Sequence, residues 1–262
     1  MQSEPVRELV KHGEVQIEVL TRGSGPLIVM LPSGGRGASD FDDVARRLAT
    51  ERFRVACPEP RGIGRSIAPV SGVTLHDFAN DVAAVIKHEG SVRAVVVGHA
   101  YGNWVARMTA ADHPDLVRGV VILAAGMKDY PKEIGDAVVK CAQALPAQER
   151  LKYLRIAFFA AGNDPSPWLG GWYPEVMHAQ HQASLAVAPD DYWTAGKAPV
   201  LDLLAADDPF RPPASRQDIQ RDLGGDRVTV RVIANASHSI VPEQPAAVVR
   251  EIAAWVKALP QS

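Results

Sequence analysis

The chain has 262 residues, a formal net charge of -2 at pH 7 and a hydrophobic content of 47%. This length supports a large buried core in one domain that carries an insertion. The sequence contains no Lys/Arg-rich block and no apolar run of the roughly 20 residues that span a bilayer, so we expect neither a nucleic-acid partner nor a membrane. Charges within residues 1–11 argue against a signal peptide, and two cysteines, Cys57 and Cys141, cannot form a disulfide framework.

These properties predict a cytoplasmic protein with a small-molecule substrate and no cofactor. They do not decide its oligomeric state, and a homodimer stays an option.

Short apolar segments typical of strands alternate along the chain with amphipathic helical patterns. The eight strand candidates are residues 8–10, 15–19, 27–31, 54–57, 94–97, 120–124, 200–204 and 229–233. Capping boxes at Ser39/Asp42 and Thr74/Asp77 predict helices that run to about Thr50 and Glu89, and further helices are expected over 101–113 and from about Gln244. This alternation predicts an α/β fold with a mostly parallel eight-stranded sheet that opens on an antiparallel hairpin.

One stretch, residues 127–199, contains no convincing strand and offers helical patterns at 132–144, 148–161 and 174–186. We therefore expect a core formed by residues 1–126 and 200–262, with 127–199 inserted as a helical cap. Aromatic residues gather in this insertion, and we interpret Tyr130, Trp168, Trp172 and Tyr192 as substrate contacts in the roof of a pocket. The alternative is that these side chains only attach the cap to the sheet.

The segment Gly98-His99-Ala100-Tyr101-Gly102 joins a buried strand to a helix through a glycine-flanked turn. Such a turn imposes strained backbone angles on its central residue, and the glycines allow strand and helix to pass closely. It has the pattern of a nucleophile elbow, G-x-S-x-G, in which serine is the nucleophile. Ala100 stands in the serine position and has no nucleophilic atom.

The base candidate is His238, which follows the last strand candidate. The acid candidates follow strand 200–204, and we choose Asp208, with Asp207 as its close competitor. Asp129, after the preceding strand, is a weaker candidate, whereas Asp202 lies within a strand and is expected to be structural. The order nucleophile, acid, histidine is the one produced when each residue ends its own parallel strand.

The glycine-rich loop 32–37 follows strand 27–31 and suits an oxyanion hole. We assign the two donors to the backbone N–H groups of Gly34 and Tyr101. Ser33, Gly35 and His99 are further candidate substrate contacts, although His99 more readily packs against the sheet. The loop lacks the spacing of a nucleotide-binding motif.

His178 and His181 lie three residues apart, but no cysteine or carboxylate stands at matching spacing, so no metal site is expected.

Taken together, these motifs make the chain resemble the α/β-hydrolase-fold family, with a helical cap between the sixth and seventh core strands. The matching marks are the elbow, the turn 59–66 after the fourth strand, Asp208 with Pro212 four residues on, and His238. In that turn, Arg61 and Arg65 are expected to be surface or loop-pinning charges. The resemblance implies hydrolysis of an ester, lactone or thioester through a Ser-His-Asp site. Three departures are Pro32-Ser33 where the family commonly has His-Gly, Ala205 where glycine is frequent, and Ala100 itself.

Ala100 allows three interpretations. In the first, the parental protein carries serine and alanine has inactivated it. In the second, alanine is natural and His238 with Asp208 serves as the base of a non-covalent lyase, isomerase or hydrolase. A weaker variant of this interpretation has Ser33, in the glycine-rich loop, supply the hydroxyl that position 100 lacks. In the third, the protein binds a ligand without catalysis. Epoxide and haloalkane hydrolysis are disfavoured, because in this fold both need a carboxylate nucleophile at position 100.

Overall fold

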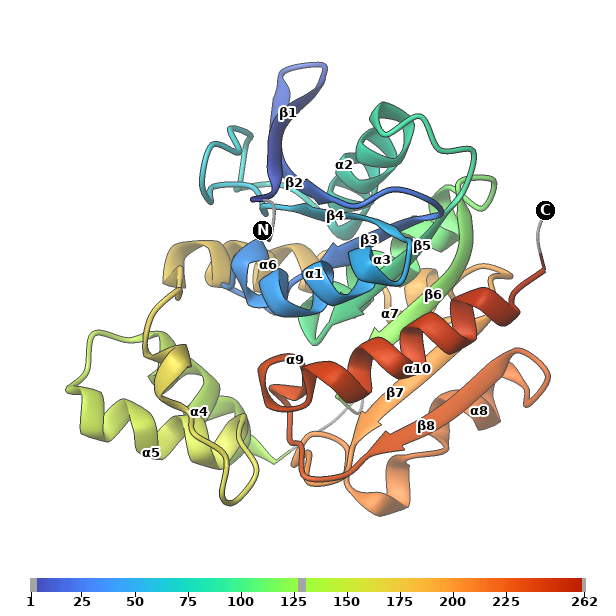
Figure 1. The fold of residues 1–262 in the computed structure, drawn as a ribbon. Coiled ribbons are helices and arrows are strands. Elements are labelled where there is room, and N and C mark those ends of the chain that lie inside the picture. Colours follow the sequence, from blue (N-terminus) through green and yellow to red (C-terminus); the bar gives the residue numbers. More distant parts are fainter. Residues whose placement is uncertain (1–3, 127–130, 261–262) are drawn as a thin grey trace.

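A computed structural model describes residues 4–126 and 131–260, which form one eight-stranded sheet with helices on both faces (Figure 1). The strand order is β1-β2-β4-β3-β5-β6-β7-β8; β1 and β2 pair antiparallel, as do β2 and β4, and all other pairs are parallel. The strands are β1 (Val6–His12), β2 (Val15–Arg22), β3 (Leu27–Leu31), β4 (Arg54–Pro58), β5 (Ala94–His99), β6 (Val117–Leu123), β7 (Val200–Ala205) and β8 (Val228–Ile233). The predicted fold class is confirmed.

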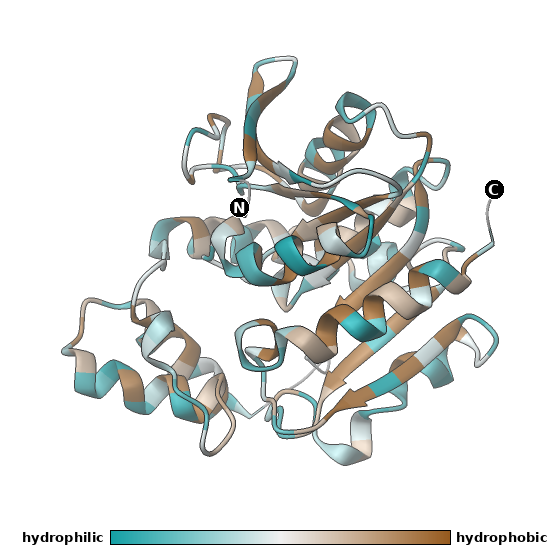
Figure 2. Ribbon diagram, viewed as in Figure 1, coloured by the Kyte–Doolittle hydropathy of each residue, from teal (hydrophilic) through white to brown (hydrophobic). Residues whose placement is uncertain are grey.

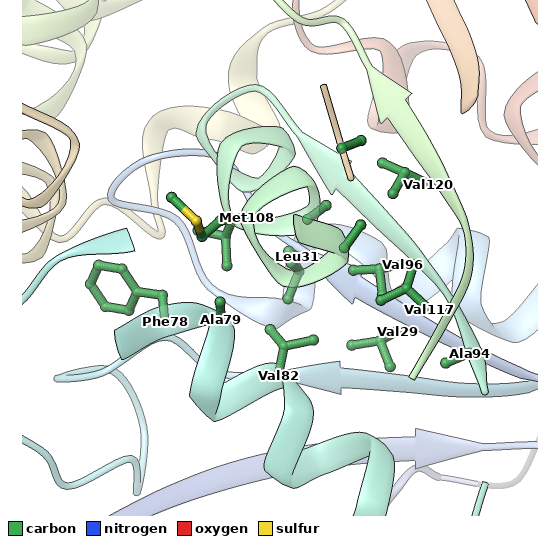
Figure 3. Packing of buried hydrophobic residues seen from close by; sticks show 14 of the residues in the cluster. Val29, Leu31, Phe78, Ala79, Val82, Ala94, Val96, Met108, Val117 and Val120 are labelled. Atoms are coloured by element: carbon green, nitrogen blue, oxygen red, sulfur yellow. The ribbon is translucent and has the colours of Figure 1, made fainter. Parts of the chain in front are cut away.

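The central strands are apolar throughout because both of their faces are covered. In β3, Ile28 and Met30 pack into one buried cluster while Val29 and Leu31 pack into the cluster on the opposite face. Figure 3 shows the second of these clusters, where side chains from β3 and β5 meet helix α2 (Leu75–His88). In Figure 2 the strands are mostly brown and many helices carry both teal and brown, as expected for helices with one buried face.

Helices from distant parts of the chain share each face of the sheet. α1 (Asp42–Thr50) and α10 (Pro245–Ala258) cover one face, while α2, α3 (Tyr101–Asp112) and α8 (Asp218–Leu223) contribute to the other. The remaining helices are α4 (Lys132–Ala142), α5 (Ala147–Ala157), α6 (Pro174–Leu185), α7 (Pro189–Trp193) and α9 (Ile240–Glu243), with short 3₁₀ turns η1 (Ala38–Phe41), η2 (Ser166–Leu169) and η3 (Pro213–Ser215).

Of the two helix starts predicted from capping boxes, the structure confirms one. The capping box at α2 is confirmed, with the Asp77 carboxylate accepting from the Thr74 N–H at 2.8 Å. The capping box expected at Ser39 is wrong, because Ser39 lies inside η1 and α1 begins at Asp42. The Ala38 N–H donates instead to the Glu59 carboxylate, which holds this turn against the loop after β4.

Helices α4 to α7, with η2, lie between β6 and β7, and we refer to residues 131–199 as the cap. α4 and α5 pack on each other to one side of the sheet, while α6 lies nearer to it (Figure 1). α5 ends at Ala157, four residues before the predicted end, and the Phe158 carbonyl accepts from Ser239 in the loop before α9. Within the described residues, none of the helices is long and apolar enough to cross a membrane.

The turn after β4 is held by a buried ion pair. The Arg61 guanidinium donates to both carboxylate oxygens of Asp81 on α2, at 2.6 and 2.8 Å, and both side chains are almost fully buried. His12 also contacts this carboxylate, at 2.8 Å. Arg65 of the same turn is half exposed and pairs with Glu18. Of the two alternatives for Arg61, the structure therefore shows the loop-pinning one.

Replacing Arg61 with methionine is expected to destabilise the protein by about 3 to 5 kcal/mol, because it leaves the buried Asp81 carboxylate without its bidentate partner. The matched change Arg65→Met removes a half-exposed guanidinium, and the Glu18 carboxylate keeps its bonds to Arg7 and to the backbone N–H of residue 65, so it should cost about 1 kcal/mol or less. Urea unfolding of both variants measures the difference, and equal losses would contradict the assignment.

Candidate active site

The elbow between β5 and α3 places Ala100 in a strained conformation with φ 47° and ψ -111°. Few non-glycine residues adopt positive φ. Glycines on either side make the crossing possible: a Cβ on Gly98 would lie 2.2 Å from the Gly102 carbonyl oxygen, and one on Gly102 would lie 2.3 Å from the Leu31 carbonyl oxygen. The elbow is therefore packed backbone to backbone against the end of β3, which carries the glycine-rich loop.

The imidazole of His238 contacts the carboxylate of Asp208. His238 Nδ1 lies 3.0 Å from Oδ2 and 3.2 Å from Oδ1, and the carboxylate is fully buried. An ionised carboxylate only accepts, so Nδ1 carries the hydrogen and Nε2 is left as the basic nitrogen. Asp207 serves this loop through its backbone, whose carbonyl accepts from Ser237 Oγ. Asp129 lies outside the described residues.

The acid loop is fixed by Arg211, which is fully buried. Its guanidinium donates to Asp202 Oδ2 at 3.0 Å and to the carbonyls of Ala125 and Ser215. Its own backbone N–H donates to the Asp208 carbonyl at 3.1 Å. The Asp202 carboxylate thus has a structural partner, and the loop that carries Asp208 is tied to the middle of β7 and to the backbone just after β6.

The loop that carries His238 is hydrogen-bonded to the cap. Ser239 donates to the Phe158 carbonyl with both its N–H, at 2.8 Å, and its hydroxyl, at 2.7 Å. The Glu243 carboxylate accepts from the N–H groups of Ser237 and Ala160, at 2.7 Å each. The backbone on either side of His238 is therefore bonded both to the core and to the end of α5.

His99 is fully buried beside the base. Its Nε2 donates to the His238 carbonyl at 2.6 Å, and the two rings lie 5.9 Å apart. Burial, reinforced by the neighbouring His238, lowers the pKa of His99 to about 3. His99 is therefore neutral near pH 7 and adds no positive charge next to the base.

A cavity of about 160 Å³ lies between the elbow, the glycine-rich loop and the cap. Five of the predicted site residues line it: Ser33, Gly34, Ala100, Tyr101 and His238. A Cβ on Gly34 would lie 3.4 Å from Tyr101 Cβ, so the two residues predicted to donate to the oxyanion contact each other in space. The structure thus brings Ala100, His238, Gly34 and Tyr101, four of the predicted site residues, to one cavity.

Other predicted contacts lie elsewhere. Gly35, His99, Trp168, Trp172 and Tyr192 are not among the residues that line this cavity. Trp168 and Trp172 pack on the Arg36 guanidinium, at 4.3 and 4.8 Å from the ring centres, and Tyr192 packs near Trp104. Tyr130 lies outside the described residues.

The sequence did not indicate the rest of the lining, which comes from several elements: Asn103, Trp104, Gly126, Val138, Phe158, Met177, His181 and Phe210. Of these, only His181 was considered above, together with His178, and it was set aside as a metal ligand. Asn103 and Trp104 lie two and three residues after Tyr101 on α3, and this closeness to the predicted elbow was the available signal.

Within residues 4–126 and 131–260, no group of three metal-ligating side chains is close enough together to hold a metal ion. The two cysteines are buried, and burial raises the pKa of the Cys141 thiol to about 12 and that of Cys57 further. Neither supplies a thiolate near neutral pH.

A family model described as the alpha/beta hydrolase family matches residues 28–251. The chain is 33% identical over 111 residues to a 2-(acetamidomethylene)succinate hydrolase from Mesorhizobium japonicum, covering 42% of this chain and 40% of that protein. It is 30% identical over 148 residues to a soluble epoxide hydrolase from a Corynebacterium species, covering 56% and 48%. These matches span about half or less of each relative.

Among solved structures, an esterase from Thermogutta terrifontis superposes with a TM-score of 0.79 and 20% identity, covering 99% of this chain and all of that one. At this identity the likeness concerns the fold alone.

Replacing His99 with glutamine should flatten the dependence of stability on pH, since glutamine keeps a donor for the His238 carbonyl but does not titrate. Because the pKa of His99 is lower in the folded state, the unfolded chain binds more protons between about pH 6.5 and 3. The stability linked to His99 is therefore present above pH 6.5 and is lost as the pH falls.

Urea unfolding between pH 4 and 7 should show a slope that is smaller in His99→Gln by up to one proton, or about 1.4 kcal/mol per pH unit. His178→Gln, at an exposed position on α6, is the control. An unchanged slope in His99→Gln would show that His99 titrates normally in the folded protein.

Proposed function

Because the chain belongs to the alpha/beta hydrolase family, we propose that its site is built to act on the carbonyl group of a small ester, lactone or thioester. The observation that carries this proposal is the bond from His238 Nδ1 to Asp208, which leaves Nε2 as a base at a cavity that Ala100 also lines. In this role Asp208 orients the imidazole and stabilises its charged form, while the N–H groups of Gly34 and Tyr101 hold the oxyanion.

Because Ala100 has no hydroxyl, this chain cannot form an acyl-enzyme at position 100. A serine there would add Oγ to the residue that the elbow presents to the cavity. His238 would take the hydroxyl proton as Oγ attacks the carbonyl carbon, and would then return it to the leaving group. The acyl-enzyme would be hydrolysed by water with the same base. Loss of the nucleophile alone typically costs about 10⁶ in kcat.

Carbonyl chemistry is favoured over the reaction named for the Corynebacterium relative. Epoxide opening in this fold needs a carboxylate at the nucleophile position, and neither Ala100 nor a serine in its place supplies one. A cavity of about 160 Å³ with Val138, Phe158, Met177 and Phe210 in its wall suits a compact, partly apolar substrate.

The second candidate function is a non-covalent reaction in which His238 acts as base on water or on the substrate itself. The intact pair of His238 and Asp208 favours it, since a chain that only binds a ligand has no need of an oriented base. In this case Ala100 is the natural residue and leaves space beside His238.

Restoring the hydroxyl distinguishes the two candidates. Ala100→Ser and the unchanged chain are assayed against short esters, lactones and thioesters, with mass spectrometry of the protein to detect an acyl adduct. We expect Ala100→Ser to show a burst and turnover at least about 10⁴-fold above the unchanged chain, because the serine acts together with an existing base and oxyanion hole.

The control is His238→Ala in the Ala100→Ser background, which should abolish both burst and turnover. Turnover by the unchanged chain that serine does not increase would favour the non-covalent function. Absence of turnover in both chains across the panel would count against carbonyl hydrolysis.

A further inference from the structure

The loop that carries the Gly34 donor is a tight turn closed by its own backbone. The Arg36 N–H donates to the Ser33 carbonyl at 3.1 Å, and Gly35 takes up positive φ, 66°. The peptide between Ser33 and Gly34 is planar and trans, so fixing its carbonyl also fixes the opposite direction of the Gly34 N–H. Whatever holds this turn therefore aims the oxyanion donor.

Both backbone polar groups of Gly35 are bonded to the cap. Its N–H donates to Gln180 Oε1 at 2.8 Å, and its carbonyl accepts from the Tyr173 N–H at 2.9 Å. The contact is close, since a Cβ on Gly35 would lie 2.7 Å from Met177 Cβ. Gln180 is buried, and its side chain reaches from α6 to hydrogen-bond the backbone of this turn.

The next residue is clamped by the cap as well. The Arg36 guanidinium is buried against Trp168 and Trp172, donates to the Gly170 carbonyl at 2.6 Å, and pairs with Asp40 of the core. The stacked, bidentate arrangement suits a planar guanidinium. Arg36 thus holds one end of the turn, and Gln180 holds its middle.

We propose that Gln180 is a positioning residue for the oxyanion hole: its amide oxygen, supplied by the cap, holds Gly35 so that the Gly34 N–H points into the cavity. This inference rests on the proposed function. Gln180 does not line the cavity, so its effect passes through the backbone of the turn. Losing it should weaken binding of the transition state and leave binding of the substrate ground state largely unchanged.

The test uses Gln180→Met in the Ala100→Ser background, since methionine keeps the length of glutamine and removes the acceptor. Gln182→Met, an exposed position on the same helix, is the matched control. We expect Gln180→Met to lower kcat at least about tenfold with KM within about twofold, and Gln182→Met to change neither. The proposal would be overturned if Gln180→Met raised KM and left kcat unchanged, or if Gln180→Met and Gln182→Met had the same kcat.

A second measurement does not depend on catalysis. Hydrogen exchange of the Gly35 amide is followed by NMR in the chain that keeps Ala100, with and without each glutamine substitution. Exchange should accelerate at least about tenfold in Gln180→Met and not in Gln182→Met. If Ala100→Ser proves inactive, the proposed function fails, and the Gly35 exchange rate alone then decides whether Gln180 holds the turn. Unchanged exchange would overturn the inference even if the hydrolase activity is found.

Discussion

The close passage of α3 over the end of β3 is the constraint on which the site depends. Gly98 and Gly102 permit it, and Ala100 between them accepts backbone angles that cost on the order of 1–3 kcal/mol. The same passage sets Tyr101 beside Gly34, so one local geometry brings Ala100 together with the two residues proposed as oxyanion donors. A strained turn is retained here although its central residue has no reactive atom.

The remaining polar groups of the site act mainly through backbone atoms. Arg211 holds the loop of Asp208, Glu243 and the Phe158 carbonyl hold the loop of His238, and neutral His99 bonds to the carbonyl of the base itself. Buried groups of this kind need partners, since an unpaired one is expensive. The His238 ring and the Asp208 carboxylate are thereby kept at hydrogen-bond distance.

The sequence alone predicted the sheet, the elbow and the loops of Asp208 and His238, because strand periodicity and glycine spacing are local properties of the chain. It did not predict how the insertion meets the core. The tryptophans at 168 and 172 suggest a pocket roof by composition, yet their rings pack on a buried arginine. Likewise, Ser39 has the spacing of a cap, but the contact of Ala38 with Glu59 sets the turn there. Such pairings join residues far apart in sequence, and no local pattern encodes them.

The two hydrogen bonds from Ser239 to the Phe158 carbonyl have a consequence for recombination within this family. They make the last turn of α5 a structural part of the loop that carries the histidine, across some 80 residues of sequence. Exchanging residues 131–199 for the equivalent segment of a relative would therefore alter the support of the base along with the shape of the cavity. A chimera that is meant to change substrate preference alone would need its first junction placed after residue 163, so that α5 and residues 158–163 stay with the parent core.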